Sequence, residues 1–431
     1  MRLPSLPSIP NLNVNIGRRV GADVVGLDIQ PGFIAAVQAR VNGSILAESA
    51  ATLPLPADTV RDGEVIDQNT LGEALRELFG SSGLGKRVRV GIANQRTVLR
   101  TLELPPITDN KELAAAVRFQ AQEQVPMPLS NAVLDFHPLG IHDTPAGPRQ
   151  RVVLVAAQRD MVERLLAAVN QAGLIAEGVD LSAFALIRSL YRADAEQVGR
   201  ILYLNVDGLT NLAIAEGPIC RFTRVVGSGL EGMAIELAER RSIPLVAARE
   251  LLAAVDLRPA VPPEEEPVAA EPAVAVETSP PSETEDERAE ERDVAGEHEA
   301  AAEHEVAETH ELDELGMSYE QLADPGKPQT SQESSQKDII NILESGIREI
   351  AGEVRNSLDF HRSQDGGGEV SHVVLSGAVQ DIPGFAEALE SALGVVVQTK
   401  DIGIVDGSLS GTAAPHRLAV ATGLAATEVP Q

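Results

Sequence analysis

Short apolar runs and amphipathic stretches alternate along most of the chain. Runs such as residues 24–29 (VVGLDI) and 151–158 (RVVLVAAQ) are almost continuously apolar and are bounded by polar or turn residues, as buried strands are. Stretches such as residues 159–173 repeat apolar positions at helical spacing and end at a glycine, as amphipathic helices do. The pattern predicts an α/β protein whose strands are covered by helices.

The same reading extends over the whole chain. Strands are predicted at residues 24–29, 33–41, 44–55, 87–93, 132–139, 151–158, 200–208, 209–217, 219–226, 372–379 and 395–398. Helices are predicted at residues 69–79, 111–124, 159–173, 180–191, 228–241, 248–257, 337–364, 385–394 and 415–426. Residues 24–93 and 200–257 share an order of hairpin strands followed by helices, which indicates two related halves.

The domain organisation follows from these two halves and from the segments between them. We expect a disordered lead-in at 1–20, a first lobe at 21–96 with the helices 178–192 and 415–426, an inserted subdomain at 97–177, a second lobe at 198–258 and 337–404, and a disordered acidic linker at 259–336. The linker contains mostly Pro, Glu, Ala, Thr and Ser, so it has too little apolar surface to offset the entropy of ordering.

Charge is concentrated in that linker. It carries 23 Asp and Glu against 3 Lys and Arg, and so accounts for most of the net charge of −29. Such a chain repels phosphate, which excludes nucleic acid as an expected partner. Aromatic residues make up 3% of the chain and Trp is absent, so the core must be aliphatic.

Cysteine and hydropathy bear on the compartment. Cys220, the one cysteine, is interpreted as a small buried apolar side chain, and a reducing compartment is expected. No apolar run reaches the length that spans a bilayer, and the first residues lack the apolar core of a signal peptide. These features predict a cytoplasmic protein.

Three segments carry a family resemblance. Residues 114–136, residues 152–190, and residues 347–364 continuing into 373–397 are similar to the PilM family of type IV pilus assembly proteins. This family lies in the FtsA/PilM branch of the actin-like ATPases, whose inserted subdomain is an SHS2 domain. The resemblance implies an α/β, actin-like (ribonuclease H-like) fold with two lobes and the insertion at 97–177.

The resemblance also implies ATP and Mg2+ between the lobes, held by two turns and an adenosine loop. The implied residues are Asp28 and Gly32 in the first turn, Asp207, Gly208, Thr210 and Asn211 in the second, and Ser376, Gly377, Pro383 and Gly384 in the loop. Asp28 and Asp207 would be the carboxylates of the metal site.

Three departures weigh against that site. Gln30 and Ala378 stand where the family usually has Gly, and Asn205 stands where Asp is usual. Two alternatives stay open: a pocket that binds ATP as a clamp between the lobes, or a pocket that has lost it. No catalytic residue is assigned, and we expect at most a weak ATPase.

The resemblance further implies a scaffold that binds the N-terminal cytoplasmic tail of PilN in a groove beside the inserted subdomain. Leu104, Leu113, Val117 and Arg118 are the candidate contacts, and ordinary core positions are the alternative for the apolar three. Pilus motor ATPases are further expected partners, and the protein would reach the inner face of the membrane only through partners.

Two rival functions remain open. One is a catalytically active ATPase of the same fold. The other is an FtsA-like, filament-forming cell-division anchor, which needs a C-terminal amphipathic helix where this chain has AATEVPQ.

Overall fold

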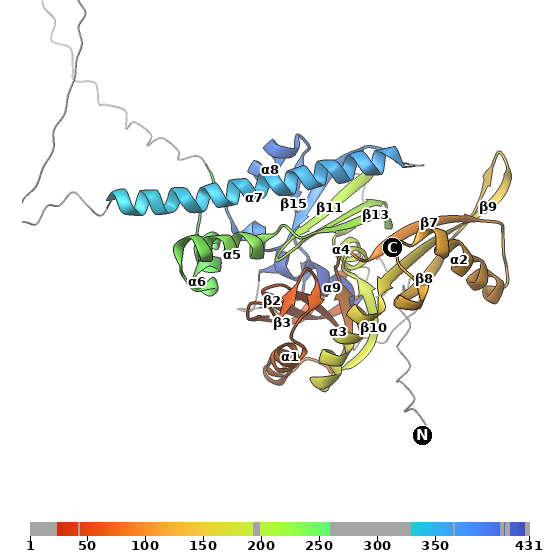
Figure 1. Cartoon of the computed structure of the whole chain (residues 1–431), viewed down its shortest axis with the longest axis horizontal. Helices are drawn as coiled ribbons and strands as arrows, with labels where there is room; N and C mark the ends of the chain where they lie inside the picture. Colours follow the sequence, from red (N-terminus) through yellow and green to blue (C-terminus); the bar gives the residue numbers. More distant parts are fainter. Residues whose placement is uncertain are drawn as a thin grey trace, which may run out of the picture. The chain divides into compact units, whose positions relative to one another are not determined.

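The structure is a computed structural model (Figure 1) that describes residues 24–41, 44–192, 199–258, 329–364, 367–405, 409 and 414–426, with 329–335 as backbone only. The predicted lead-in 1–20 and all but the end of the predicted linker 259–336 lie outside these residues.

The first sheet has the strand order β10-β6-β1-β2-β3-β16. Strands β1, β2 and β3 pair antiparallel, whereas β6 and β10 continue from β1 in parallel and β16 pairs parallel to β3. The bounds are β1 Val25–Gln30, β2 Phe33–Val41, β3 Ile45–Pro54, β6 Arg87–Ile92, β10 Ile175–Leu181 and β16 Gly403–Ile404. A small ribbon, β4 Val60–Arg61 and β5 Glu64–Val65, follows β3 along the chain.

The second sheet repeats this arrangement in the order β13-β12-β11-β14-β15. Again three antiparallel strands are followed by two parallel ones. The bounds are β11 Arg200–Val206, β12 Thr210–Glu216, β13 Ile219–Val226, β14 Val370–Ser376 and β15 Val397–Thr399. The order β13-β12-β11-β14-β15 is that of β3-β2-β1-β6-β10, which confirms the prediction of two related lobes.

Nine helices and three 3-10 turns belong to the described residues. They are α1 Gln68–Ser82, α2 Asn110–Gln124, α3 Arg159–Gln171, α4 Ser182–Leu190, α5 Leu230–Arg241, α6 Leu245–Ala253, α7 Gln329–Ser363, α8 Phe385–Leu393, α9 Ala419–Ala425, η1 Leu129–Asn131, η2 Ala378–Asp381 and η3 Pro415–Leu418.

A third sheet forms the inserted layer, with the order β7-β9-β8. Its strands are β7 Val98–Leu104, β8 Ala132–Thr144 and β9 Gly147–Gln158, and all pair antiparallel. Alternation along β9 divides its side chains between two cores. Val152 and Leu154 pack with α2, whereas Val153 and Val155 join the core of the first lobe.

Helix α4 packs against both lobes. All nine of its residues are buried, and it contacts β10 and β6 of the first sheet and β12 and β13 of the second. Alternation along β11 matches this position: Tyr203 lies in the core that contains α4, whereas Leu202 and Leu204 lie in the core beneath α5, α7 and α8. The apolar sequence of α4 thus reflects burial on every side.

Two buried arginines hold the end of α9 in the first lobe. Arg89 Nη1 donates to the carbonyl oxygens of Leu424 (2.8 Å) and Ala426 (2.9 Å), and Arg188 Nε donates to that of Gly423 (3.0 Å). The guanidinium of Arg188 also pairs with Asp180 at the end of β10. Because cations stabilise the carbonyl end of a helix, these arginines fix α9 against β1 and β6.

The structure corrects three predicted helix boundaries. Helix α7 begins at Gln329 rather than at 337, in a stretch without the apolar period that reveals a helix. Helix α6 begins at Leu245 rather than at 248, and the predicted helix 415–426 divides into η3 and α9. Cys220 on β13 is 8% exposed, and burial raises its pKa to about 12, which agrees with its interpretation as a buried apolar side chain.

We predict that Arg188→Ala lowers the free energy of unfolding by about 3–5 kcal/mol, because it leaves the buried Asp180 carboxylate without its cation. Denaturant unfolding measures this loss. The matched control is the double variant Asp180→Leu with Arg188→Met, which removes both charges and should recover much of the stability. If both variants lose the same free energy of unfolding, the unpaired Asp180 carboxylate is not the cause of the loss.

Candidate functional site

The tight turns of the two lobes touch each other. The turn between β1 and β2 contains Pro31 and Gly32, and the turn between β11 and β12 contains Asp207 and Gly208. A Cβ added to Gly208 would lie 2.1 Å from the carbonyl oxygen of Pro31. Only glycine permits this approach, so backbone meets backbone here with no side chain between the lobes.

The turn between β1 and β2 offers few hydrogen-bond donors. Gln30 and Phe33 are paired across the hairpin, and Pro31 has no N–H group. Gly32 takes a φ of +91°, as the third residue of such a two-residue turn must. This leaves the N–H of Gly32 as the one backbone donor between the paired ends of the strands.

Asp28 and Asp207 form a buried acidic pair at this contact. Both side chains are at most 2% exposed. Gln30 Nε2 donates to Asp28 Oδ1 over 3.1 Å, so the Gln30 side chain contacts the carboxylate directly. Burial and then the charge of Asp207 raise the pKa of Asp28 to about 7, although the Gln30 hydrogen bond opposes this.

The carboxylate of Asp207 is held by two donors of its own lobe. The Ala378 N–H donates to Oδ1 over 2.6 Å, and Asn205 Nδ2 donates to Oδ2 over 2.7 Å. Burial raises the pKa of Asp207, even though both hydrogen bonds and the charges of Arg417 and His416 lower it. Asp207 thus ties the second turn to the loop after β14.

The segment predicted as the adenosine loop follows β14 and contacts the segment that contains His416. Ser376 Oγ and the Gly377 N–H both donate to the carbonyl oxygen of His416, over 3.0 and 3.1 Å. Gly377 and Gly384 have φ values of +99° and +85°, which only glycine adopts readily. The Pro383 carbonyl accepts the Leu257 N–H over 2.8 Å, so this loop also fixes the segment that follows α6.

A cavity of about 480 Å3 adjoins these turns. Its walls come from the first turn, the end of β3, α5, α6, η2 and η3. Four of its ionisable groups form two ion pairs, Arg249 with Glu231 and Arg417 with Asp381, and Asp207 also lines it. Burial raises the pKa of Asp381, but His416 and Arg417 outweigh burial and hold it below its ordinary value.

Two predicted phosphate contacts are placed differently from each other. Thr210 Oγ1 donates to the Ser228 carbonyl oxygen over 2.6 Å, close to the joint. Asn211, the next residue on the strand, points to the other face. There it lines a separate cavity of about 20 Å3 together with Thr97, which is room for about one water molecule.

The sequence analysis missed the loop between β13 and α5. A Cβ on Gly229 would lie 2.5 Å from the Gly208 carbonyl oxygen, and the Leu230 N–H donates to the Asp207 carbonyl oxygen over 2.8 Å. Gly227-Ser228-Gly229 is a glycine pair that leads from a strand into a helix. This glycine pair between a strand and a helix could have identified the loop from the sequence.

The predicted partner contacts lie on and beneath α2. Leu104, Leu113 and Val117 are 2–3% exposed and form the core between α2 and its sheet, so in this structure they are core residues. Arg118 is exposed, and its neighbour Phe119 is 69% exposed, although the sequence analysis did not select it. Partner contact at these positions stays a prediction.

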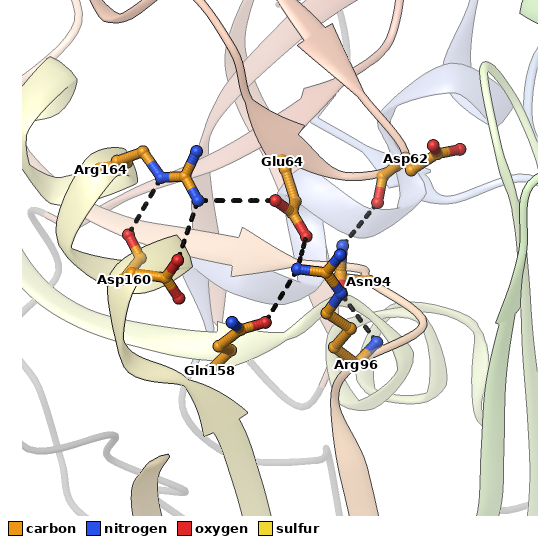
Figure 2. Close-up of polar contacts among 7 residues, drawn as sticks. All are labelled: Asp62, Glu64, Asn94, Arg96, Gln158, Asp160 and Arg164. Carbon is orange, nitrogen blue, oxygen red and sulfur yellow. Dashed lines mark hydrogen bonds and ion pairs between the residues drawn. The ribbon is translucent and has the colours of Figure 1, made fainter. Parts of the chain in front are cut away.

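A polar cluster joins the inserted layer to the first lobe (Figure 2). Glu64 of β5 accepts from Arg96 Nη1 over 3.0 Å and faces Arg164 Nη2 of α3 at 3.7 Å. Arg96 also donates to Gln158 at the end of β9, and Arg164 pairs with Asp160. Glu64 is the acceptor that these two cations share, and its side chain is 14% exposed.

Asn94 fixes the strand exit at the same junction. Its Nδ2 donates to the Asp62 carbonyl oxygen over 2.6 Å, and its Oδ1 accepts the Arg96 N–H over 2.7 Å. These bonds set the direction in which the chain leaves β6 for β7.

Two general findings apply to the part of the chain that the structure describes. No helix there is both long enough and apolar enough to cross a bilayer. No group of three or more His, Cys, Asp or Glu there is placed to hold a metal ion.

Residues 26–199 match the family model described as "Type IV pilus assembly protein PilM". They span the first five strands of the first sheet and the whole inserted layer. Over these residues, about two fifths of its length, the chain is similar to the PilM family.

One solved structure supports the fold. A structure described as a PilM-PilN type IV pilus biogenesis complex matches at a TM-score of 0.64 and 19% identity, over 94% of this chain and 97% of that chain. EutJ from Carboxydothermus hydrogenoformans matches at a TM-score of 0.46 and 13% identity, over 96% and 93%, which is too low to support an argument. The chain has the two-lobed α/β fold of the PilM-PilN structure.

ATP and Mg2+, which this fold implies, fit the joint poorly. A phosphate cradle needs several converging N–H donors, but the first turn presents Pro31, and the Ala378 and Leu230 N–H groups already bond to Asp207. Glycines 208 and 229 bring backbones together where a phosphate would need room. The adjoining cavity could receive a nucleoside by volume, but the residues of the joint do not accommodate the phosphates with their metal.

The buried acidic pair predicts a pH dependence. The folded chain binds the Asp28 proton more tightly (pKa about 7) than the unfolded chain does (3.8), so the free energy of unfolding falls as the pH rises between these values. Asp28→Asn removes this penalty. Without divalent cations, it should stabilise the chain by about 2–4 kcal/mol at about pH 8 and change little at about pH 4. The exposed-site control Asp359→Asn should show no such difference, and an equal effect of Asp28→Asn at both pH values would contradict the prediction.

The junction of Figure 2 predicts a smaller loss. Glu64→Ala removes the acceptor shared by Arg96 and Arg164 and should lower the free energy of unfolding by about 1–2 kcal/mol in urea. Glu48→Ala is the control, because its pair with Arg40 is more exposed and should contribute less than about 0.5 kcal/mol. If Glu64→Ala lowers the free energy of unfolding no more than Glu48→Ala does, the polar cluster does not stabilise the attachment of the inserted layer to the first lobe.

Proposed function

We propose that this chain is a scaffold of type IV pilus assembly that binds the N-terminal cytoplasmic tail of a PilN-type membrane protein. The family match over residues 26–199 carries the proposal, since it includes the inserted layer in full. A matching structure of the same fold is described as a PilM-PilN complex, which supports the partner's identity. The scaffold would act in the cytoplasm and reach the inner face of the membrane through that partner.

The exposed face of α2 is the surface we assign to the tail. Among the residues that the structure describes, Phe119 is the most exposed large apolar side chain, and Arg118 lies beside it. Aromatic and arginine side chains contribute most to peptide recognition, because they bury much area and also pair with polar groups. The core of Leu104, Leu113 and Val117 beneath would hold this face rigid.

The proposal needs no ATP turnover. Its support is the joint between the lobes, where Asp207 engages the donors that a phosphate would need. Motor ATPases would then be partners that supply the energy for pilus extension. Phosphate release from Mg-ATP by the purified chain, above a control without protein, would favour the rival of an active ATPase.

We predict that Phe119→Ala weakens binding of the PilN-type tail peptide at least tenfold. The peptide, from the PilN-type protein encoded with this chain, is titrated calorimetrically. Phe360→Ala is the matched control, because Phe360 is 51% exposed but lies on α7 of the second lobe, and it should bind the peptide as the unaltered chain does. If the unaltered chain, Phe119→Ala and Phe360→Ala bind the peptide with equal affinity, α2 is not the binding surface. If the unaltered chain does not bind the peptide, the proposed function is refuted.

A further inference from the structure

Three glycines bring four backbone segments into contact at the joint. Gly208 meets the Pro31 carbonyl, Gly229 meets the Gly208 carbonyl, and a Cβ on Gly377 would lie 2.4 Å from the Val206 carbonyl oxygen. Each contact leaves no room for even one extra carbon. The segments therefore pack on one another at the place where two lobes of this topology face each other.

The amides of these segments bond to the chain itself. The N–H groups of Ala378 and Leu230 donate to Asp207, one to its carboxylate and one to its carbonyl, and the Gly377 N–H donates to the His416 carbonyl. A carboxylate that accepts a backbone N–H and a side-chain amide occupies the donors much as a phosphate oxygen would.

Further contacts link the lobes on two sides of the cavity. His416 Nε2 and Arg417 Nε, in the segment that leads into α9 of the first lobe, bond to Asp381 of the second lobe over 2.8 and 2.6 Å. Arg249 of α6 pairs with Glu231 and donates to the Leu55 carbonyl oxygen of the first lobe over 3.3 Å. Gly32 lies against this pair, since a Cβ there would be 2.7 Å from Glu231 Oε2.

We infer that the cleft is a joint closed without nucleotide, in which the Asp207 carboxylate takes the place of a phosphate and the chain's own contacts hold the lobes together. The closed joint rests on the proposed scaffold role, because it explains how the scaffold keeps its shape without nucleotide. A joint closed in this way does not open and close with nucleotide, so the peptide-binding face keeps one geometry.

Titration of the unaltered chain with Mg-ATP and Mg-ADP tests this directly. We expect no binding heat and a thermal midpoint unchanged within about 1 °C at millimolar nucleotide. A ligand at about a hundred times its dissociation constant would raise that midpoint by roughly 5 °C or more. Such a rise, or saturable heat, overturns the inference.

Asp207→Gly adds a second readout. It removes the carboxylate and opens space at the same donors, so this variant should lose thermal stability and regain part of it with inorganic phosphate. The controls are the unaltered chain and Asp359→Ala, which removes an exposed carboxylate of α7, and neither should respond to phosphate. If Asp207→Gly does not fold, the titration of the unaltered chain decides alone.

Peptide binding separates this inference from the proposed function. The tail peptide should bind with equal affinity, within about twofold, with and without Mg-ATP. If neither the peptide nor the nucleotide binds, the proposed scaffold function is refuted and the inference of a closed joint is supported. If the affinity for the peptide rises severalfold with Mg-ATP, the inference of a closed joint is refuted and the proposed scaffold function is supported.

Discussion

The contact between Gly208 and the Pro31 carbonyl is the constraint on which the arrangement of the lobes depends. It lies where a tight turn of one sheet meets a tight turn of a second sheet with the same strand order. A side chain at Gly208 would separate the two turns, and one at Gly229 would disturb the hydrogen bonds that Asp207 makes within the second lobe. Short turns and small residues determine how closely the two turns meet, and the ion pairs of Asp381 with His416 and Arg417 add to the contact between the lobes.

The rest of the structure extends from that joint. Helix α4 fills the space between the sheets with nine buried residues, and Arg89 and Arg188 hold α9 beside it. The inserted layer is attached to the first lobe by the core around Val153 and Val155 and by the polar cluster of Glu64. These contacts hold the inserted layer, and with it the exposed face of α2, in a fixed position on the first lobe.

Much of the fold could be predicted because its signals are local. Apolar runs located most strands of the two lobes, although not β10 and β16, and their repeated order predicted the duplication that the sheets confirm. The start of α7 was missed because residues 329–336 are polar, so no apolar period marks them. Helix boundaries depend on capping and packing that a periodic pattern does not contain.

The candidate site was less predictable, because it depends on contacts between distant segments. The segments predicted as two turns and an adenosine loop lie next to one another, but their role in nucleotide binding stays a prediction. The sequence could not show that Asp207 bonds to Ala378 or that Gln30 bonds to Asp28. Adjacent residues on a strand face opposite ways, so Thr210 lies near the joint while Asn211 lines another cavity. Burial likewise distinguishes Leu113 and Val117 from the exposed Phe119, three residues of one helix that sequence alone treats alike.

The central claim is that the lobes are closed by the chain's own groups. The most direct measurement is a crystal structure of the chain grown with millimolar Mg2+ and ATP. We predict that the Asp207 carboxylate still accepts the Ala378 N–H and that Gly208 still touches Pro31, with no phosphate between the turns. A triphosphate and metal ion bound between the two turns, with Asp207 displaced from Ala378, would contradict the account.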